Sequence, residues 1–127
     1  MHKGKFVTAI SCMDGRIQLP VHAWLMKKYN LDYVDTITEP GPDKMLSLGT
    51  AQQVESIKSR VLISVNAHGS DTIFISAHHD CAGNPVSREE HIQMVKNCIG
   101  IIKGWNLPVK NIIGAWIDDK WNISVVE

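Results

Sequence analysis

The sequence predicts a single α/β domain, residues 1–127, with a mostly parallel five-stranded sheet flanked by helices. Short β-prone runs alternate with longer segments in which apolar residues recur every three or four positions. The last two expected strands are joined by a turn so short that they must pair antiparallel. A length of 127 residues suits one domain, and no linker or internal repeat interrupts it. The expected order of elements is βαβαβαββ.

The first part of the chain is expected to form a strand, a helix and a second strand. Phe6–Ile10 is a β-prone run that leads into Cys12. A helix is expected from Pro20 to about Tyr29, because the missing N–H of a proline costs nothing at the first helical position. Tyr33–Thr38 is expected to be the second strand. Glu39–Asp43 is expected to be a loop, since two prolines and a glycine interrupt both helix and sheet.

The middle of the chain is expected to form one long helix and a buried strand. The helix covers Ser47–Ala67 and ends at Gly69, a residue that readily adopts the left-handed conformation of a helix end. Thr72–Ala77 is the expected buried strand, and it leads to His78. The apolar residues that recur at helical spacing are Val54, Ile57, Val61, Leu62 and Val65.

The last part of the chain is expected to form a helix and a strand pair. Ser87 and Glu90 match a capping box for a helix that runs to about Lys103. Asn111–Ile117 and Asn122–Val126 are the expected fourth and fifth strands. Together with the earlier segments they complete the five-stranded sheet.

Charge and cysteine content exclude several classes of protein. Basic and acidic residues number 13 each, whereas a nucleic-acid-binding domain usually shows a basic excess, so no nucleic-acid partner is expected. No segment has the length and apolarity of a signal peptide or membrane span, so no membrane partner is expected either. Three cysteines form no even disulfide framework, which favours a cytoplasmic location. Cys98, inside a helical pattern, is expected to be a core thiol.

Two motifs carry the chemistry of the chain, and each follows a predicted strand. Cys12 follows the first strand, whereas His78 and Cys81 follow the third. Open α/β sheets bind ligands beyond the carboxyl ends of strands, where the strand order reverses. Thiolate and imidazole are ligands that Zn2+ prefers. We therefore expect Cys12, His78 and Cys81 to bind Zn2+, with His79 directed to the opposite side of the chain from His78.

Asp14 and Arg16 flank the first cysteine and allow two arrangements. Asp14 could be the fourth ligand, which closes the metal. Alternatively, it could accept a two-pronged hydrogen bond from Arg16, which leaves the fourth position to water. An imidazole is also needed to release protons near neutral pH, and the candidates are His22, His79 and His91. Otherwise His22 and His91 would be solvated helix positions.

Cys12-x-Asp14-x-Arg16 and His78-x-x-Cys81 resemble the motifs of the β-class carbonic anhydrases. The resemblance extends over most of the chain. Segment 7–16 is similar to the first strand and zinc loop of that family, and segment 72–81 to its third strand and second zinc loop. Segment 111–117 is similar to the strand before the final antiparallel one.

The resemblance implies a fold, an activity and an assembly. The implied sheet order is 2-1-3-4-5. The implied ligands of Zn2+ are Cys12, His78 and Cys81, with Asp14 and Arg16 as the catalytic pair that opens or closes the metal. The implied reaction is the reversible hydration of a small-molecule substrate, CO2, by a zinc-bound hydroxide. The implied assembly is a homodimer or a higher even-numbered homo-oligomer.

The chain also departs from the pattern of the family. The helices that usually precede the first strand are missing, so a short member without an N-terminal helical arm is expected. Ala82 stands directly after Cys81, where the family usually has a glycine. Where the family commonly has Arg-Asn-Ala-Gly, this chain reads Thr38-Glu39-Pro40-Gly41-Pro42. Because that loop lines the substrate pocket of the family, one alternative is a related zinc hydrolase acting on COS- or CS2-like substrates. Another alternative is a non-catalytic zinc-binding dimer in which Asp14 permanently closes the metal.

Overall fold

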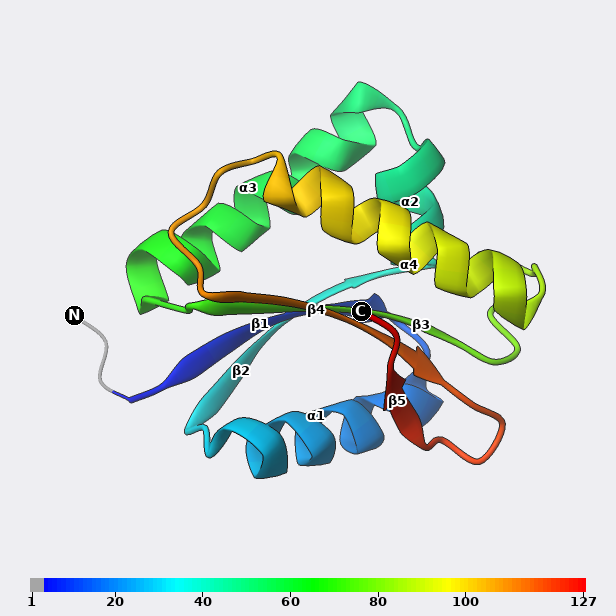
Figure 1. Ribbon diagram of the computed structural model, residues 1–127, viewed down its shortest axis with the longest axis horizontal. Helices are drawn as coiled ribbons and strands as arrows, with labels where there is room; N and C mark the ends of the chain where they lie inside the picture. The colour runs from blue at the N-terminus through cyan, green and yellow to red at the C-terminus, as the bar shows by residue number, and fades with distance from the viewer. Residues whose placement is uncertain (1–3) are drawn as a thin grey trace.

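The computed structural model describes residues 4–127, which form an open sheet with helices on both faces (Figure 1). The predicted α/β fold is confirmed, with the sheet order β2-β1-β3-β4-β5. The strands are β1 (Phe6–Cys12), β2 (Tyr33–Glu39), β3 (Thr72–His78), β4 (Asn111–Ile117) and β5 (Ile123–Val125). The helices are α1 (Gly15–Tyr29), α2 (Pro42–Leu48), α3 (Ala51–His68) and α4 (Arg88–Lys103).

The central strands place the ends of β1 and β3 next to each other. β1 pairs in parallel with β2 on one side and with β3 on the other, and Ile10 lies opposite Ile75. β3 and β4 are also parallel, whereas β4 and β5 are antiparallel, as the short turn between them requires. The strand order therefore reverses between β1 and β3. Cys12 and His78, the last residues of these two strands, lie at that point.

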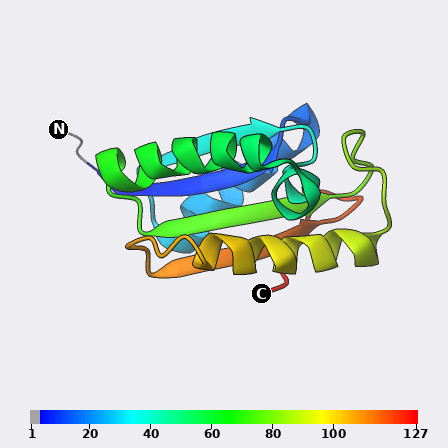
Figure 2. The same ribbon diagram turned by 90° about the horizontal axis from the view of Figure 1, so that it is seen from above.

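The sheet separates two apolar cores. α1 covers one face, whereas α2, α3 and α4 cover the other (Figure 1). Seen from above, strands of the sheet are visible between α3 and α4, and the short α2 packs against both helices near the carboxyl ends of the central strands (Figure 2). The larger core includes Ile10, Ile57, Val61, Ile75, Val95, Cys98 and Ile99. Cys98 is thus a buried core thiol, as expected, and its burial raises the pKa of the thiol to about 12.

The expected start of the first helix at Pro20 is wrong, because α1 begins at Gly15. The carboxylate of Asp14 caps the helix by accepting the backbone N–H of Arg16. Pro20 lies inside the helix, where its ring nitrogen forfeits one backbone bond. The hydrogen bond to this capping carboxylate therefore sets the start of α1, and it also holds the Asp14 side chain beside Cys12.

The expected loop over 39–43 and the single helix over 47–67 are also wrong. α2 begins at Pro42, so the connection from β2 shrinks to Pro40 and Gly41. A proline at the first helical position starts this helix rather than preventing it. The next helix is separate, because Thr50 and Gln53 form a full capping box at the start of α3. The extra helix lies directly beside the candidate site.

The remaining elements match the predictions to within one or two residues. Ser87 caps α4 by accepting the backbone N–H of Glu90. β5 is shorter than expected and covers Ile123–Val125. Within residues 4–127, no helix combines the length and the apolarity that a membrane crossing needs.

Candidate metal centre

The structure brings the three predicted ligands together at the carboxyl end of the sheet. Cys12 ends β1, His78 ends β3, and Cys81 lies in the loop that follows. Their ligand atoms all lie within 4.8 Å of one another, and all three residues are buried. The two Sγ atoms are 3.9 Å apart. Two sulfurs that each lie about 2.3 Å from one tetrahedral zinc ion would be separated by about 3.8 Å, so the spacing fits a shared metal.

His78 has the orientation of a ligand. Its Nδ1 lies 2.7 Å from the carbonyl oxygen of His79, to which it donates. This bond leaves Nε2 as the acceptor of a neutral ring, and Nε2 is buried without a hydrogen-bond partner. A carbonyl that fixes the far nitrogen of a ligating imidazole is a common support of metal sites. His79 itself is exposed, which agrees with the prediction that only one of the two imidazoles enters the site.

Contacts among the three candidate ligands, together with their burial, shift the pKa values of their side chains. The pKa of Cys12 is lowered to about 4, chiefly because its thiolate accepts the hydrogen of the Cys81 thiol and despite the opposing effect of burial. The pKa of Cys81 is raised well above its usual range by the same bond and by burial. Burial lowers the pKa of His78, but the neighbouring Cys12 thiolate and the hydrogen bond to the His79 carbonyl outweigh it, so the pKa is raised. The buried protons therefore lie where a metal ion would replace them.

Asp14 is held by Arg16 rather than included among the ligand atoms. Nε of Arg16 donates to Oδ1 of Asp14 at 3.0 Å, and an Nη atom donates to Oδ2 at 2.7 Å. The guanidinium lowers the pKa of Asp14 to about 2, so the carboxylate is ionised at neutral pH. Oδ2 of Asp14 still lies 4.0 Å from Nε2 of His78. The structure thus has the arrangement in which Arg16 holds the carboxylate beside the ligand group.

Asp80 and Trp121, which the sequence analysis did not assign to the site, fix Arg16 from two other sides. The guanidinium donates to the Asp80 carboxylate at 3.2 Å and to the Asp80 carbonyl at 3.1 Å. Its central carbon lies 4.9 Å from the centre of the Trp121 ring. Both residues have a positive φ, 58° for Asp80 and 64° for Trp121, which is uncommon outside glycine. The position of Asp80 between His78 and Cys81 was the available sequence signal, whereas Trp121 gave none.

The three imidazoles proposed for proton release differ in their surroundings. His79 is exposed, and His22 lies 2.9 Å from the hydroxyl of Thr36. The expectation of a solvated position for His91 is wrong, since its side chain is 2% exposed. Its Nδ1 lies 2.7 Å from a carboxylate oxygen of Asp43 in the first turn of α2. The unpredicted helix therefore explains the burial of His91.

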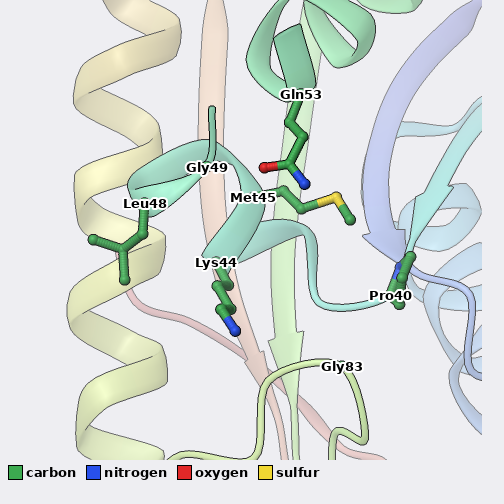
Figure 3. A pocket seen from close by; sticks show the side chains of 7 residues that line it. All are labelled: Pro40, Lys44, Met45, Leu48, Gly49, Gln53 and Gly83. Atoms are coloured by element: carbon green, nitrogen blue, oxygen red, sulfur yellow. The ribbon is translucent and has the colours of Figure 1, made fainter. Parts of the chain in front are cut away.

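A cavity of about 260 Å³ lies beside the loop that carries Cys81, which contributes Gly83 to its lining. Figure 3 shows Met45 extending from α2 toward Pro40, and Lys44 directed toward the loop at Gly83. None of the three ligand residues lines the cavity. The full lining is Pro40, Lys44, Met45, Leu48, Gly49, Gln53 and Gly83.

The comparisons with known proteins agree with this geometry. No curated protein matches the sequence. A family model described as "Putative carbonic anhydrase" matches residues 2–127. The match includes the Cys-His-Cys group, which could hold a metal ion, and the acid–arginine pair beside it. The chain therefore belongs to the carbonic anhydrase family that this model describes.

Proposed function

We propose that the protein is a zinc-dependent carbonic anhydrase that hydrates CO2 reversibly to bicarbonate. The observation that carries the proposal is the buried group of Cys12, His78 and Cys81, in which Nε2 of His78 lacks a partner and the sulfurs have the spacing of a shared ion. Two thiolates and an imidazole suit zinc better than Mg2+ or Ca2+, which prefer oxygen ligands. Three ligands leave a fourth position, as in catalytic zinc sites.

The metal would supply acidity, because a zinc-bound water loses its proton near neutral pH. The chain's residues would keep the fourth position open to that water. Asp14 is the acid that could close it, and Arg16 holds both of its carboxylate oxygens. With the carboxylate still 4.0 Å from Nε2 of His78, Asp14 is placed to accept a hydrogen bond from a molecule at the fourth position. Asp14 would thereby orient the reacting oxygen without becoming protonated itself.

Arg16 would perform this role because its own position is fixed. Asp80 accepts two hydrogen bonds from the guanidinium, and the Trp121 ring covers its face. A guanidinium forms such planar and stacked contacts, whereas a lysine ammonium does not. Asp80 also belongs to the loop between His78 and Cys81. Its contacts with Arg16 therefore join the segment that follows Cys12 to the loop that carries Cys81.

His79 is the best placed of the three imidazoles to release the proton. It follows a proposed ligand and is exposed, so it can exchange protons with solvent. His22 is partly exposed, and its ring already pairs with Thr36. His91 is buried against Asp43, which isolates it from solvent.

The test measures zinc content together with CO2 hydration on the same preparation across pH. One equivalent of zinc with hydration that is lost on chelation and regained with Zn2+ would support the proposal. Stoichiometric zinc with hydrolysis of COS or CS2, and none of CO2, would favour the related hydrolase. Stoichiometric zinc with no activity would indicate a binding protein closed by Asp14. A protein that binds no metal would contradict all three.

We also propose a homodimer or a higher even-numbered assembly. Apolar side chains near the first metal loop favour it: Met13 is 63% exposed and Leu19 is 82% exposed. Sedimentation equilibrium of the zinc-loaded protein tests this, and a monomer at micromolar concentration would contradict it. The cytoplasmic location stays a prediction from the sequence.

A further inference from the structure

We propose that Asp43 is a positioning residue of the metal centre: through Asn84 it holds the loop that carries Cys81 at the distance from Cys12 that one ion requires. The inference rests on the proposed function only in its assumption of a bound metal. It concerns a residue outside the ligand group and outside the pair formed by Asp14 and Arg16.

Asp43 is the centre of a buried polar network. Its side chain is 1% exposed, and one carboxylate oxygen, Oδ2, accepts from Nδ1 of His91 at 2.7 Å and from Nδ2 of Asn84 at 3.1 Å. Asn84 and His91 are each 2% exposed. Burying an acid is costly unless hydrogen bonds compensate, so a carboxylate at this position has to be explained by what it holds.

Asn84 connects this acid to the second metal loop. Its backbone N–H donates to the carbonyl of Cys81 at 3.3 Å, so Asn84 and Cys81 belong to one tight turn. The side-chain amide extends from that turn to Asp43. Removing the amide would therefore release the Cys81 loop from α2 and leave the bond between Asp43 and His91 intact.

The connection from β2 to α2 contacts the same loop through two glycines. A Cβ atom on Gly41, which has φ +68°, would lie 2.9 Å from Cβ of Asn84. A Cβ atom on Gly83 would lie 2.5 Å from the carbonyl carbon of Pro40. The two backbones thus approach more closely than any side chain would allow, and the loop can take this position only with glycine at both sites.

The first metal loop is attached to the same connection. The backbone N–H of Met13, the residue after Cys12, donates to the carbonyl of Glu39 at 3.0 Å. Glu39 is followed directly by the Pro40–Gly41 turn and then by α2. Both metal loops are therefore fastened to the start of α2, one through Glu39 and the other through Asp43.

Asp43 is itself fixed by groups on α2 and α4. Its carbonyl accepts from the hydroxyl of Ser47 at 2.6 Å and from the thiol of Cys98 at 3.3 Å. His91 packs against Trp116 of β4, with ring centres 5.5 Å apart. A carboxylate anchored in this way can define where the Cys81 loop lies.

The experiment compares zinc affinity among four variants. Asn84→Ala removes the amide that connects the Cys81 loop to Asp43, and Asp43→Ala removes the carboxylate that accepts from Asn84 and His91. Asp43→Asn keeps one oxygen that can accept both of these hydrogen bonds. The matched control is Ser64→Ala, which removes an equally buried hydrogen-bonding group at the other end of the sheet. The dissociation constant for Zn2+ is measured by competition with a chromophoric chelator. The unfolding temperature of each metal-free variant is measured in parallel.

We expect Asn84→Ala and Asp43→Ala to weaken zinc binding roughly 10- to 100-fold, the usual effect of losing an outer support of a metal site. Asp43→Asn should retain an affinity close to that of the parent. Ser64→Ala should lower the unfolding temperature without changing the affinity. Cobalt substitution gives a second readout, because a displaced Cys81 would weaken the thiolate-to-cobalt absorption band.

Parent-like affinity in folded Asn84→Ala and Asp43→Ala would overturn the inference. If Asp43→Ala does not fold, Asn84→Ala decides, and failure of both to fold would assign the network a purely structural role and also overturn it. A parent protein that binds Zn2+ without hydrating CO2 would refute the proposed function and leave this inference standing if the two variants bind more weakly. A parent protein that binds no Zn2+ would refute both.

Discussion

Two buried polar networks lie at opposite ends of the sheet, and they differ in how completely they are paired. At the amino end, the hydroxyl of Thr8 bonds to Ser64 at 2.6 Å and to Ser70 at 2.8 Å, and Ser64 donates to Asp35 at 2.7 Å. His68 pairs with the same carboxylate. The atoms of this amino-end network are paired. Among the described residues, the buried side-chain atoms that lack a hydrogen-bond partner are Ser11 Oγ, Asp43 Oδ1, Ser76 Oγ and His78 Nε2.

All four unpaired atoms lie toward the carboxyl ends of β1 and β3 or in the first turn of α2. A fully paired network fixes a core, whereas an unpaired buried atom costs free energy and needs another explanation. For His78 the explanation we propose is a metal ion. The amino-end network therefore serves as the structural reference, and the carboxyl end is where the unpaired buried atoms and the candidate metal centre lie.

Removal of a ligand should have the largest effect. Cys12→Ser replaces a soft thiolate by a hydroxyl, so we expect loss of both bound zinc and CO2 hydration. Metal analysis by mass spectrometry after gel filtration measures the first, and stopped-flow pH-indicator assays measure the second. Cys98→Ser, which changes a core thiol outside the ligand group, is the matched control. Stoichiometric zinc in the Cys12 variant would contradict the ligand assignment.

A drop in pH should weaken zinc binding strongly. The pKa of Cys81 is raised well above its usual range in the metal-free site, so at neutral pH this thiol holds a proton that the metal must displace. Apparent affinity should therefore fall as pH falls, by roughly tenfold per unit for each displaced proton. The pKa of Cys12 is lowered by the hydrogen bond from the Cys81 thiol, so Cys12 should contribute less to this slope. Chelator competition at pH 6, 7 and 8 measures the slope, and a flat profile would refute this proton arrangement.

Loss of the arginine should separate metal binding from catalysis. In Arg16→Ala the Asp14 carboxylate loses both of its side-chain donors and is free to approach the metal. We expect kcat to fall roughly 100-fold or more, as when a preorganised donor is removed, with zinc content unchanged. Lys110→Ala, which removes an exposed charge before β4 at the amino end of the sheet, controls for the loss of a charge. Full CO2 hydration by Arg16→Ala would refute the role of the pair.

A change at the amino end should affect stability alone. Ser64→Ala removes one hydrogen-bond partner from Thr8 and one from Asp35, so the free energy of unfolding should fall by about 1–3 kcal/mol. Urea denaturation of the metal-free protein measures this. An accompanying change in kcat would show that the two ends of the sheet are coupled, which would end the contrast between them.

Loss of the stacked ring should have the smallest effect. Trp121→Ala removes a contact over Arg16 worth about 0.5–1 kcal/mol, so kcat should fall about two- to fivefold. Trp105→Ala removes a similar contact with Lys58 on another face and is the matched control. An equal loss of kcat in the two variants would contradict the assignment of Trp121 to the candidate site.

The pattern of neighbouring residues sufficed to predict most of the fold and to point to the three side chains that the structure brings together at the candidate metal centre. Strand-like and helix-like runs depend on residues two to four positions apart, and such spacing is visible in any sequence. The errors arose where local signals conflict. Pro20 resembles a helix start but is outweighed by the cap at Asp14, and Pro42 resembles a loop but starts α2. The 47–67 pattern concealed a break that the Thr50 capping box creates.

The sequence by itself determined the alternation of elements and the two motifs, because periodicity, caps and ligand chemistry are properties of neighbouring residues. Only the tertiary structure decided that Arg16 is held by Asp80 and that His91 is buried against Asp43. Those partners lie 64 and 48 positions apart in the chain. Contacts at such separations depend on sheet order and register, which form only when the whole core packs and which no short stretch of sequence encodes.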